Sequence, residues 1–180
     1  MKEIQMKYHH AAAISIFTTA ILFSSLVTST TVHAQGFYGE IGLTPLHLKS
    51  EAGDISHPQT LRFLVGKELH ENLAVEALYV ATYSKDSRPG FDAKATHYGL
   101  LLKPKYALTT DIEAFARIGV AHSNFTASST EDRRGSDLAY GIGLQTTLTK
   151  SIYGQIDYMT YHDKEGQSSK GYTVSIGTRF

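Results

Sequence analysis

The chain has 180 residues, with 17 Lys and Arg, 17 Asp and Glu, nine His and no Cys. A formal charge of zero gives no electrostatic reason to expect a nucleic acid as partner, and the absence of Cys excludes disulfides and thiolate metal sites. The length suits one domain.

The first 34 residues have the three-part layout of a secretory signal peptide. Lys2 lies in a short basic start, an apolar stretch follows, and small residues lead up to Ala34. We therefore predict cleavage between Ala34 and Gln35, with residues 1–34 as signal peptide and residues 35–180 as the exported domain. The alternative is a retained helical anchor. It is disfavoured because hydroxyl residues interrupt a stretch already shorter than the roughly 20 apolar residues that a spanning helix needs.

Eight blocks of alternating residues follow in the exported part. In each block the residues alternate between two faces, one of which is free of charge in its middle, and this period of two predicts a β-strand. No stretch in this part is long and apolar enough for a helical span, so it could cross a membrane only with strands. The blocks are residues 37–44, 59–67, 75–82, 94–106, 113–120, 137–149, 152–161 and 172–180.

Charges in these blocks gather on one face. The opposite face carries none in its middle, which favours a barrel whose uncharged wall meets lipid and whose polar face is enclosed. Burying a lone ion costs several kcal/mol, so enclosed charges must pair with one another or with polar groups. We predict an ion network inside the barrel with these members: Glu40, Arg62, Glu76, Lys103, Glu113, Arg117, Asp157 and Arg179.

The connections between blocks alternate in length. The short ones are residues 68–72, 107–111 and 149–151, and the longer polar ones are residues 49–58, 84–93, 124–136 and 163–170. Transmembrane barrels of bacteria have short turns at one end and long loops at the other. The fold class predicted is therefore all-β: an eight-stranded antiparallel up-and-down transmembrane β-barrel, preceded by a cleavable signal peptide.

Aromatic residues on the uncharged faces support a membrane location, because Tyr and other aromatic side chains collect at membrane interfaces. They are Phe37, Phe63, Tyr79, Tyr83, Tyr98, Tyr140, Tyr158, Tyr172 and Phe180. A soluble periplasmic lipocalin-like binding barrel remains as the alternative, because each period-two pattern taken alone is a weak signal.

The last block carries Tyr172, Val174, Ile176 and the final Phe180 at alternate positions. This end resembles the terminal-strand signal that the barrel assembly machinery of Gram-negative bacteria reads. The exported part as a whole resembles the OmpA-like or OmpX-like small barrels, a porin family of outer-membrane proteins. The stretches that carry this resemblance are residues 36–42, 63–66, 71–76 and 116–120.

The resemblance implies a location in the outer membrane of a Gram-negative bacterium, in contact with outer-membrane lipid and lipopolysaccharide. Some small barrels are lipid A deacylases, with a His and a Ser separated by one residue and oriented by a carboxylate. Here His122 and Ser123 are adjacent, with Glu131 or Asp132 as possible orienting acids. Adjacent residues of a strand point to opposite faces, so this spacing argues against such a site.

An eight-stranded barrel has room inside for side chains or one small ligand, so a wide channel is not expected. We predict a non-enzymatic protein with a structural or surface-interaction role, such as adhesion or envelope integrity, through loops that meet a host or surface ligand. The alternative is a lipid A-modifying hydrolase. The remaining histidines are dispersed, so we expect no metal site, and we expect no cofactor.

Overall fold

The computed structural model describes residues 36–50, 53, 55–88, 91–127, 130–164 and 166–180. The predicted signal peptide, with its cleavage point between Ala34 and Gln35, lies outside the described residues and stays a prediction. Among the described residues, no helix is long and apolar enough to cross a membrane.

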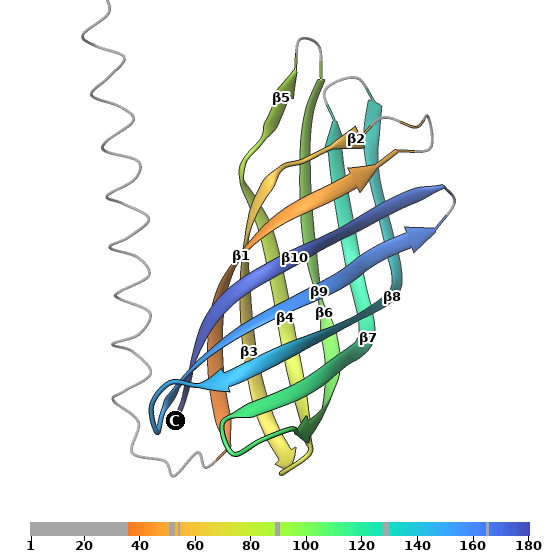
Figure 1. Cartoon of the computed structure of the whole chain (residues 1–180). Helices are drawn as coiled ribbons and strands as arrows, with labels where there is room; N and C mark the ends of the chain where they lie inside the picture. Colours follow the sequence, from red (N-terminus) through yellow and green to blue (C-terminus); the bar gives the residue numbers. More distant parts are fainter. Residues whose placement is uncertain (1–35, 51–52, 54, 89–90, 128–129, 165) are drawn as a thin grey trace, which may run out of the picture. The chain divides into compact units, whose positions relative to one another are not determined.

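Within the described residues, eight long antiparallel strands form one closed barrel (Figure 1). Each long strand pairs with the next, and the first pairs with the last, as Ile41 opposite Ile176 illustrates. The short strands β2 (Ile55–Ser56) and β5 (Asp86–Arg88) pair with β1 and β6. The long strands are β1 (Phe37–Lys49), β3 (Gln59–His70), β4 (Leu73–Ser84), β6 (Phe91–Ala107), β7 (Ile112–Ala127), β8 (Thr130–Thr147), β9 (Ile152–Lys164) and β10 (Gln167–Arg179). The predicted fold class is confirmed for the barrel.

Side chains alternate between the lumen and the outer wall. Along β1, Ile41 and Leu43 are exposed, whereas Glu40 is buried. Ile142 is 69% exposed, and the other large exposed residues of the wall are Leu, Val, Ile, Phe and Tyr. Such an apolar wall suits lipid and would be an aggregation surface in water. It therefore disfavours the soluble barrel alternative.

The two ends of the barrel differ. At one, here called the turn end, short connections join β3 to β4, β6 to β7 and β8 to β9. The sheet also closes there, where the Phe180 N–H donates to the Phe37 carbonyl at 2.9 Å. The opposite end, here called the loop end, carries the connections from β1 to β3, β4 to β6, β7 to β8 and β9 to β10.

The strands run further toward the loop end than the sequence predicts. The β7–β8 ladder continues to the pair Ala127 and Thr130, and the β9–β10 ladder to Lys164 and Gln167. The predicted polar loops at 84–93, 124–136 and 163–170 are thus mostly paired hairpin, and their assignment as loops was wrong. Backbone hydrogen bonds sustain antiparallel pairing between polar residues as well, whereas apolar alternation marks only the lipid-facing part.

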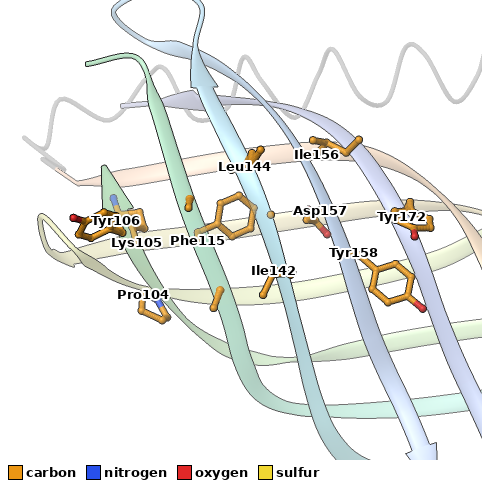
Figure 2. A pocket seen from close by; sticks show the side chains of 13 residues that line it. Pro104, Lys105, Tyr106, Phe115, Ile142, Leu144, Ile156, Asp157, Tyr158 and Tyr172 are labelled. Atoms are coloured by element: carbon orange, nitrogen blue, oxygen red, sulfur yellow. The ribbon is translucent and has the colours of Figure 1, made fainter. Parts of the chain in front are cut away.

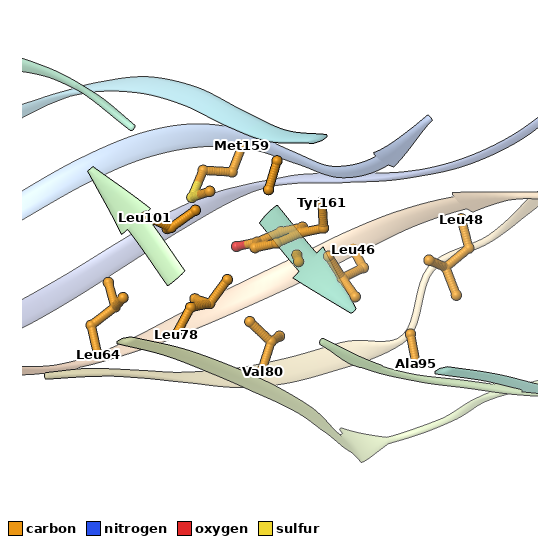
Figure 3. Packing of buried hydrophobic residues seen from close by; sticks show 11 residues of the cluster. Leu46, Leu48, Leu64, Leu78, Val80, Ala95, Leu101, Met159 and Tyr161 are labelled. Atoms are coloured by element: carbon orange, nitrogen blue, oxygen red, sulfur yellow. The ribbon is translucent and has the colours of Figure 1, made fainter. Parts of the chain in front are cut away.

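Apolar side chains fill much of the lumen toward the loop end. Figure 3 shows Leu78, Leu101, Met159 and Tyr161 converging from different strands. On β4, Leu78 lies further from the turn end than the inward-facing Glu76. We call this group the apolar cluster; its buried members are Leu46, Leu48, Leu64, Leu78, Val80, Ala95, Leu101, Ala121, Ala139, Met159 and Tyr161.

Candidate functional site

Arg117 is the centre of a buried group of ions inside the barrel. Its guanidinium donates from Nε to Glu76 Oε2 at 2.6 Å, from Nη1 to Asp157 Oδ2 at 2.9 Å and from Nη2 to Glu40 Oε2 at 3.2 Å. The three acids come from β4, β9 and β1, so one side chain connects four strands across the lumen. All four side chains have exposed fractions of 1% or less.

Arg62 on β3 is the second bridging cation. It donates from Nη2 to Glu40 Oε1 at 2.8 Å and forms a two-pronged pair with the Asp157 carboxylate. Such bidentate pairs combine strength with fixed geometry. Ser175 Oγ also donates to Glu40 Oε1 at 2.9 Å, so a strand at the barrel's closing seam takes part in the same group.

Lys103 on β6 is held differently. Its ammonium lies 3.5 Å from Glu76 Oε1 and donates to the side-chain carbonyls of Gln145 and Gln155 at 3.1 and 3.3 Å. It also lies 4.4 Å from the centre of the Phe115 ring. Amide oxygens and an aromatic face together replace the water molecules that the ammonium loses on burial.

We call Glu40, Arg62, Glu76, Lys103, Arg117 and Asp157 the charge network. The structure brings these six of the eight predicted residues together, with three positive and three negative groups. The other two, Glu113 and Arg179, lie 3.8 Å apart and are about one-third exposed. They form a pair at the turn end, because their positions on β7 and β10 are close to the ends of those strands. Gln145 links this pair to the charge network, since its amide nitrogen donates to Glu113 and its carbonyl accepts from Lys103.

Two inward tyrosines, Tyr38 and Tyr153, lie in the lumen near the turn end. Neither is among the residues predicted from the sequence. The Tyr38 hydroxyl donates to Glu76 Oε1 at 2.7 Å, and its ring meets that of Tyr153 edge to face. Tyr38 lies opposite Gly66 in the ladder, and Tyr153 lies opposite Gly177. A Cβ on Gly66 would approach the Tyr38 ring to 2.2 Å. A large inward residue opposite a glycine is the sequence signal that could have found both.

His122 and Ser123 do not form a site. They point to opposite faces of β7, and Ser123 is buried in the lumen with its Oγ 2.8 Å from His97 Nδ1. His97 also contacts Ser169 Oγ at 3.0 Å through Nε2. On the outer wall, His122 Nδ1 lies 3.0 Å from Ser136 Oγ. The side chains of Glu131 and Asp132, the suggested orienting acids, are outside the described ones.

A shallow groove of about 680 Å³ lies on the outer wall near the turn end (Figure 2). Ala114 and Ala116 of β7 leave space between larger neighbours such as Leu144 and Tyr106. Because the groove opens on the apolar wall, it faces lipid.

The described part of the chain contains no group of three or more His, Asp and Glu residues arranged to hold a metal ion. The chemistry of the lumen is that of a packed interior, since its ions neutralise one another and the apolar cluster lies above them. The ionisable side chains of the charge network are buried among the described residues.

The model of the outer membrane protein beta-barrel domain matches residues 16–180. Comparison with curated protein sequences gave no match. Among solved structures, Ail, the attachment invasion locus protein of Yersinia pestis, is similar with a TM-score of 0.63 and 19% identity, covering 81% of this chain and 99% of Ail.

Two further barrels are similar. Neisserial surface protein A has a TM-score of 0.64 and 13% identity, covering 81% of this chain and 98% of that protein. The N-terminal barrel of Pseudomonas aeruginosa OprF has a TM-score of 0.55 and 14% identity, with the same two coverages. At these identities the likeness shows a shared fold. The family match and the fold together assign the chain to the outer membrane protein beta-barrel family, as a protein of the Gram-negative outer membrane.

Proposed function

We propose that this protein is a non-enzymatic surface-attachment barrel, whose hairpins at the loop end contact a host or environmental surface. In outer-membrane barrels the short turns are periplasmic and the loops extracellular, which places the loop end outside the cell. The observation that carries the proposal is the closed lumen. Because the charge network and the apolar cluster occupy it, the surface left for recognition is that of the extracellular hairpins.

The length of the hairpins supports this role. On β7 and β8 the ladder continues past the pair Ile118 and Tyr140, through Asn124 and Arg134, to Ala127 and Thr130. The outward residues of this extension include Asn124, Arg134 and, on β6, Lys94. A polar hairpin that stays paired is a rigid platform, and rigid platforms lose less conformational entropy on binding than free loops do.

The relatives support it as well. Ail carries attachment in its name and has been solved with the heparin analogue sucrose octasulfate, and Neisserial surface protein A is a surface protein by name. A sulfated polysaccharide is therefore the first ligand class to try. Outer-membrane lipid and lipopolysaccharide around the wall, and the assembly machinery acting on β10, complete the proposed set of partners.

Attachment is tested by presenting the protein on cells of a non-adherent Gram-negative host. We expect the cells to bind immobilised heparin or epithelial monolayers, and replacement of residues 124–136 by a short turn to reduce binding at least about fivefold through loss of contact area. The matched control carries a substitution in the turn between β8 and β9, Lys150→Ala, and keeps its binding. Equal binding by cells with and without the protein would rule out the attachment role.

The hydrolase alternative has one specific observation in its favour, the His122 and Ser136 contact on the lipid-facing wall. A Ser activated by His could attack an acyl ester of outer-leaflet lipid. We expect the mass spectrum of lipid A to be the same in cells that express the wild type, His122→Ala, Ser136→Ala or no protein at all. Loss of an acyl chain that depends on both residues would replace the attachment proposal by the enzyme.

A further inference from the structure

Two histidines that are ten residues apart in sequence meet on the outside of the barrel. His47 Nδ1 and His57 Nε2 are 3.0 Å apart, with ring centres at 4.9 Å. His47 lies near the loop end of β1, and His57 follows β2 in the link to β3. The contact joins β1 to the link between β2 and β3.

Both rings are reachable from water. Leu46 and Leu48 point into the lumen and are buried, so His47 between them faces the outer side. His57 is exposed. The link that carries it is held in place because the His57 backbone N–H donates to Asp86 Oδ2 at 2.8 Å. The two rings thus come from β1 and from the link between β2 and β3, and the Asp86 carboxylate fixes the backbone of that link.

The separation of the nitrogens suits metal coordination. Imidazole nitrogens bind Zn²⁺ at about 2.0–2.1 Å in tetrahedral geometry, which places two of them roughly 3.3 Å apart. The observed 3.0 Å differs from this by a few tenths of an ångström. Rotation of the two side chains would turn the nitrogen lone pairs, which lie along the hydrogen bond in the free pair, toward one shared metal ion. The geometry points to a binding site formed by His47 and His57 for a divalent transition metal ion, Zn²⁺, Cu²⁺ or Ni²⁺, with water in the remaining positions.

Coordination requires one proton to move. In the free pair, one of the two facing nitrogens carries the hydrogen that it donates to the other. On metal binding that ring takes its other neutral tautomer, so both facing nitrogens present lone pairs and no net proton is released from neutral rings. Imidazole prefers Zn²⁺, Cu²⁺ and Ni²⁺, whereas Ca²⁺ and Mg²⁺ prefer oxygen ligands.

The surrounding charges set the expected strength. Lys170 lies opposite His47 in the β1–β10 ladder, and Lys49 is two residues further along the same face of β1. These cations oppose a bound metal, and Asp86 opposes them in turn. We therefore expect a site weaker than one with three protein ligands, with positions open to a ligand from another molecule. This inference does not depend on the proposed attachment role.

The test uses untagged full-length barrel, refolded in detergent micelles and titrated with ZnCl₂ by calorimetry. Loss of a direct ligand costs at least as much as loss of a supporting group, so His47→Asn or His57→Asn should weaken the strongest Zn²⁺ step at least about tenfold. His70→Asn at the turn end and His122→Asn on the wall are the matched controls and should leave it unchanged. An excess of CaCl₂ should not compete.

Electron paramagnetic resonance with one equivalent of Cu²⁺ provides the independent readout. We expect hyperfine splitting from two nitrogen donors in the wild type and from fewer in each single variant, with the heat-dependent gel shift showing that every variant is folded. Wild type and the His47→Asn, His57→Asn double variant with the same Zn²⁺ isotherm and the same Cu²⁺ spectrum would overturn the site and leave the pair as a plain hydrogen bond.

Discussion

Arg117 shows how one residue couples the barrel together. Arg117 is 1% exposed, and its guanidinium binds carboxylates from three other strands. A buried ion is costly unless its partners are present, and the cost falls on whichever group is left behind. Each member of the charge network therefore depends on the others, because a buried charge without its partners destabilises the barrel.

Arg117→Met tests this directly. Removal of the guanidinium leaves Glu40, Glu76 and Asp157 with fewer partners in a dry lumen, and we expect the free energy of unfolding to fall by about 3–5 kcal/mol. The measurement is urea unfolding of the barrel in phospholipid vesicles, followed by circular dichroism. Glu113→Gln, at the partly exposed pair with Arg179, is the control. Its amide oxygen can still accept from Gln145, so it should cost less than about 1 kcal/mol. An unchanged unfolding midpoint for Arg117→Met would contradict the role of the network.

The two lumen tyrosines offer a matched pair. The Tyr38 hydroxyl donates to Glu76, whereas the buried Tyr153 hydroxyl has no protein partner among the described residues. A hydrogen bond to a charged group is worth about 1.5–3 kcal/mol, so Tyr38→Phe should destabilise the barrel by that amount. Tyr153→Phe should change stability little. The same urea titration measures both variants, and equal losses would show that the hydrogen bond from Tyr38 to Glu76 adds nothing beyond what the Tyr153 hydroxyl contributes.

At the scale of elements, β10 closes the sheet and carries the predicted assembly signal. The residues of this signal all face outward and are more than half exposed: Tyr172, Val174, Ile176 and Phe180. Their side chains are therefore accessible to the assembly machinery before the barrel enters lipid. Their alternation follows from the strand period. The backbone of β10 pairs with β1 and closes the barrel, while the outward side chains of β10 carry the predicted assembly signal.

Phe180→Ala separates recognition from folding. Phe180 is outside the lumen, so the finished barrel should remain about as stable, while assembly in cells slows because an aromatic contact on β10 is lost. We expect less heat-modifiable protein in the outer-membrane fraction at equal expression. Leu148→Ala, an exposed apolar residue in the turn between β8 and β9, is the control. An undiminished outer-membrane level would show that the final Phe is not read.

At the scale of the whole molecule, buried side chains occupy the lumen of the barrel. The charge network occupies the lumen toward the turn end, and the apolar cluster fills it toward the loop end together with the buried, hydrogen-bonded His97, Ser123 and Ser169. Eight strands leave only enough space for such side chains. The wall is apolar and the hairpins at the loop end are polar, so the proposed attachment would use a different surface from the one that meets lipid.

Closure of the lumen predicts that the protein carries no solute. Liposomes that contain the barrel should swell in an arabinose gradient at the rate of protein-free liposomes, because no continuous water path crosses the charge network and the apolar cluster. A sixteen-stranded porin in parallel liposomes gives the positive signal. Swelling above the protein-free rate would mean that the lumen opens in the membrane.

Strand count, the lumen and lipid faces, and the inward charges are all readable from the sequence, because side chains of a strand alternate strictly and lipid demands an apolar wall. The partners are not. That Arg117 joins three acids while Glu113 and Arg179 form a pair at the rim depends on strand tilt and register, which bring distant residues to one height. The extension of β7 and β8 and the meeting of His47 with His57 were likewise decided by backbone pairing in three dimensions, where polar side chains leave no periodic signal.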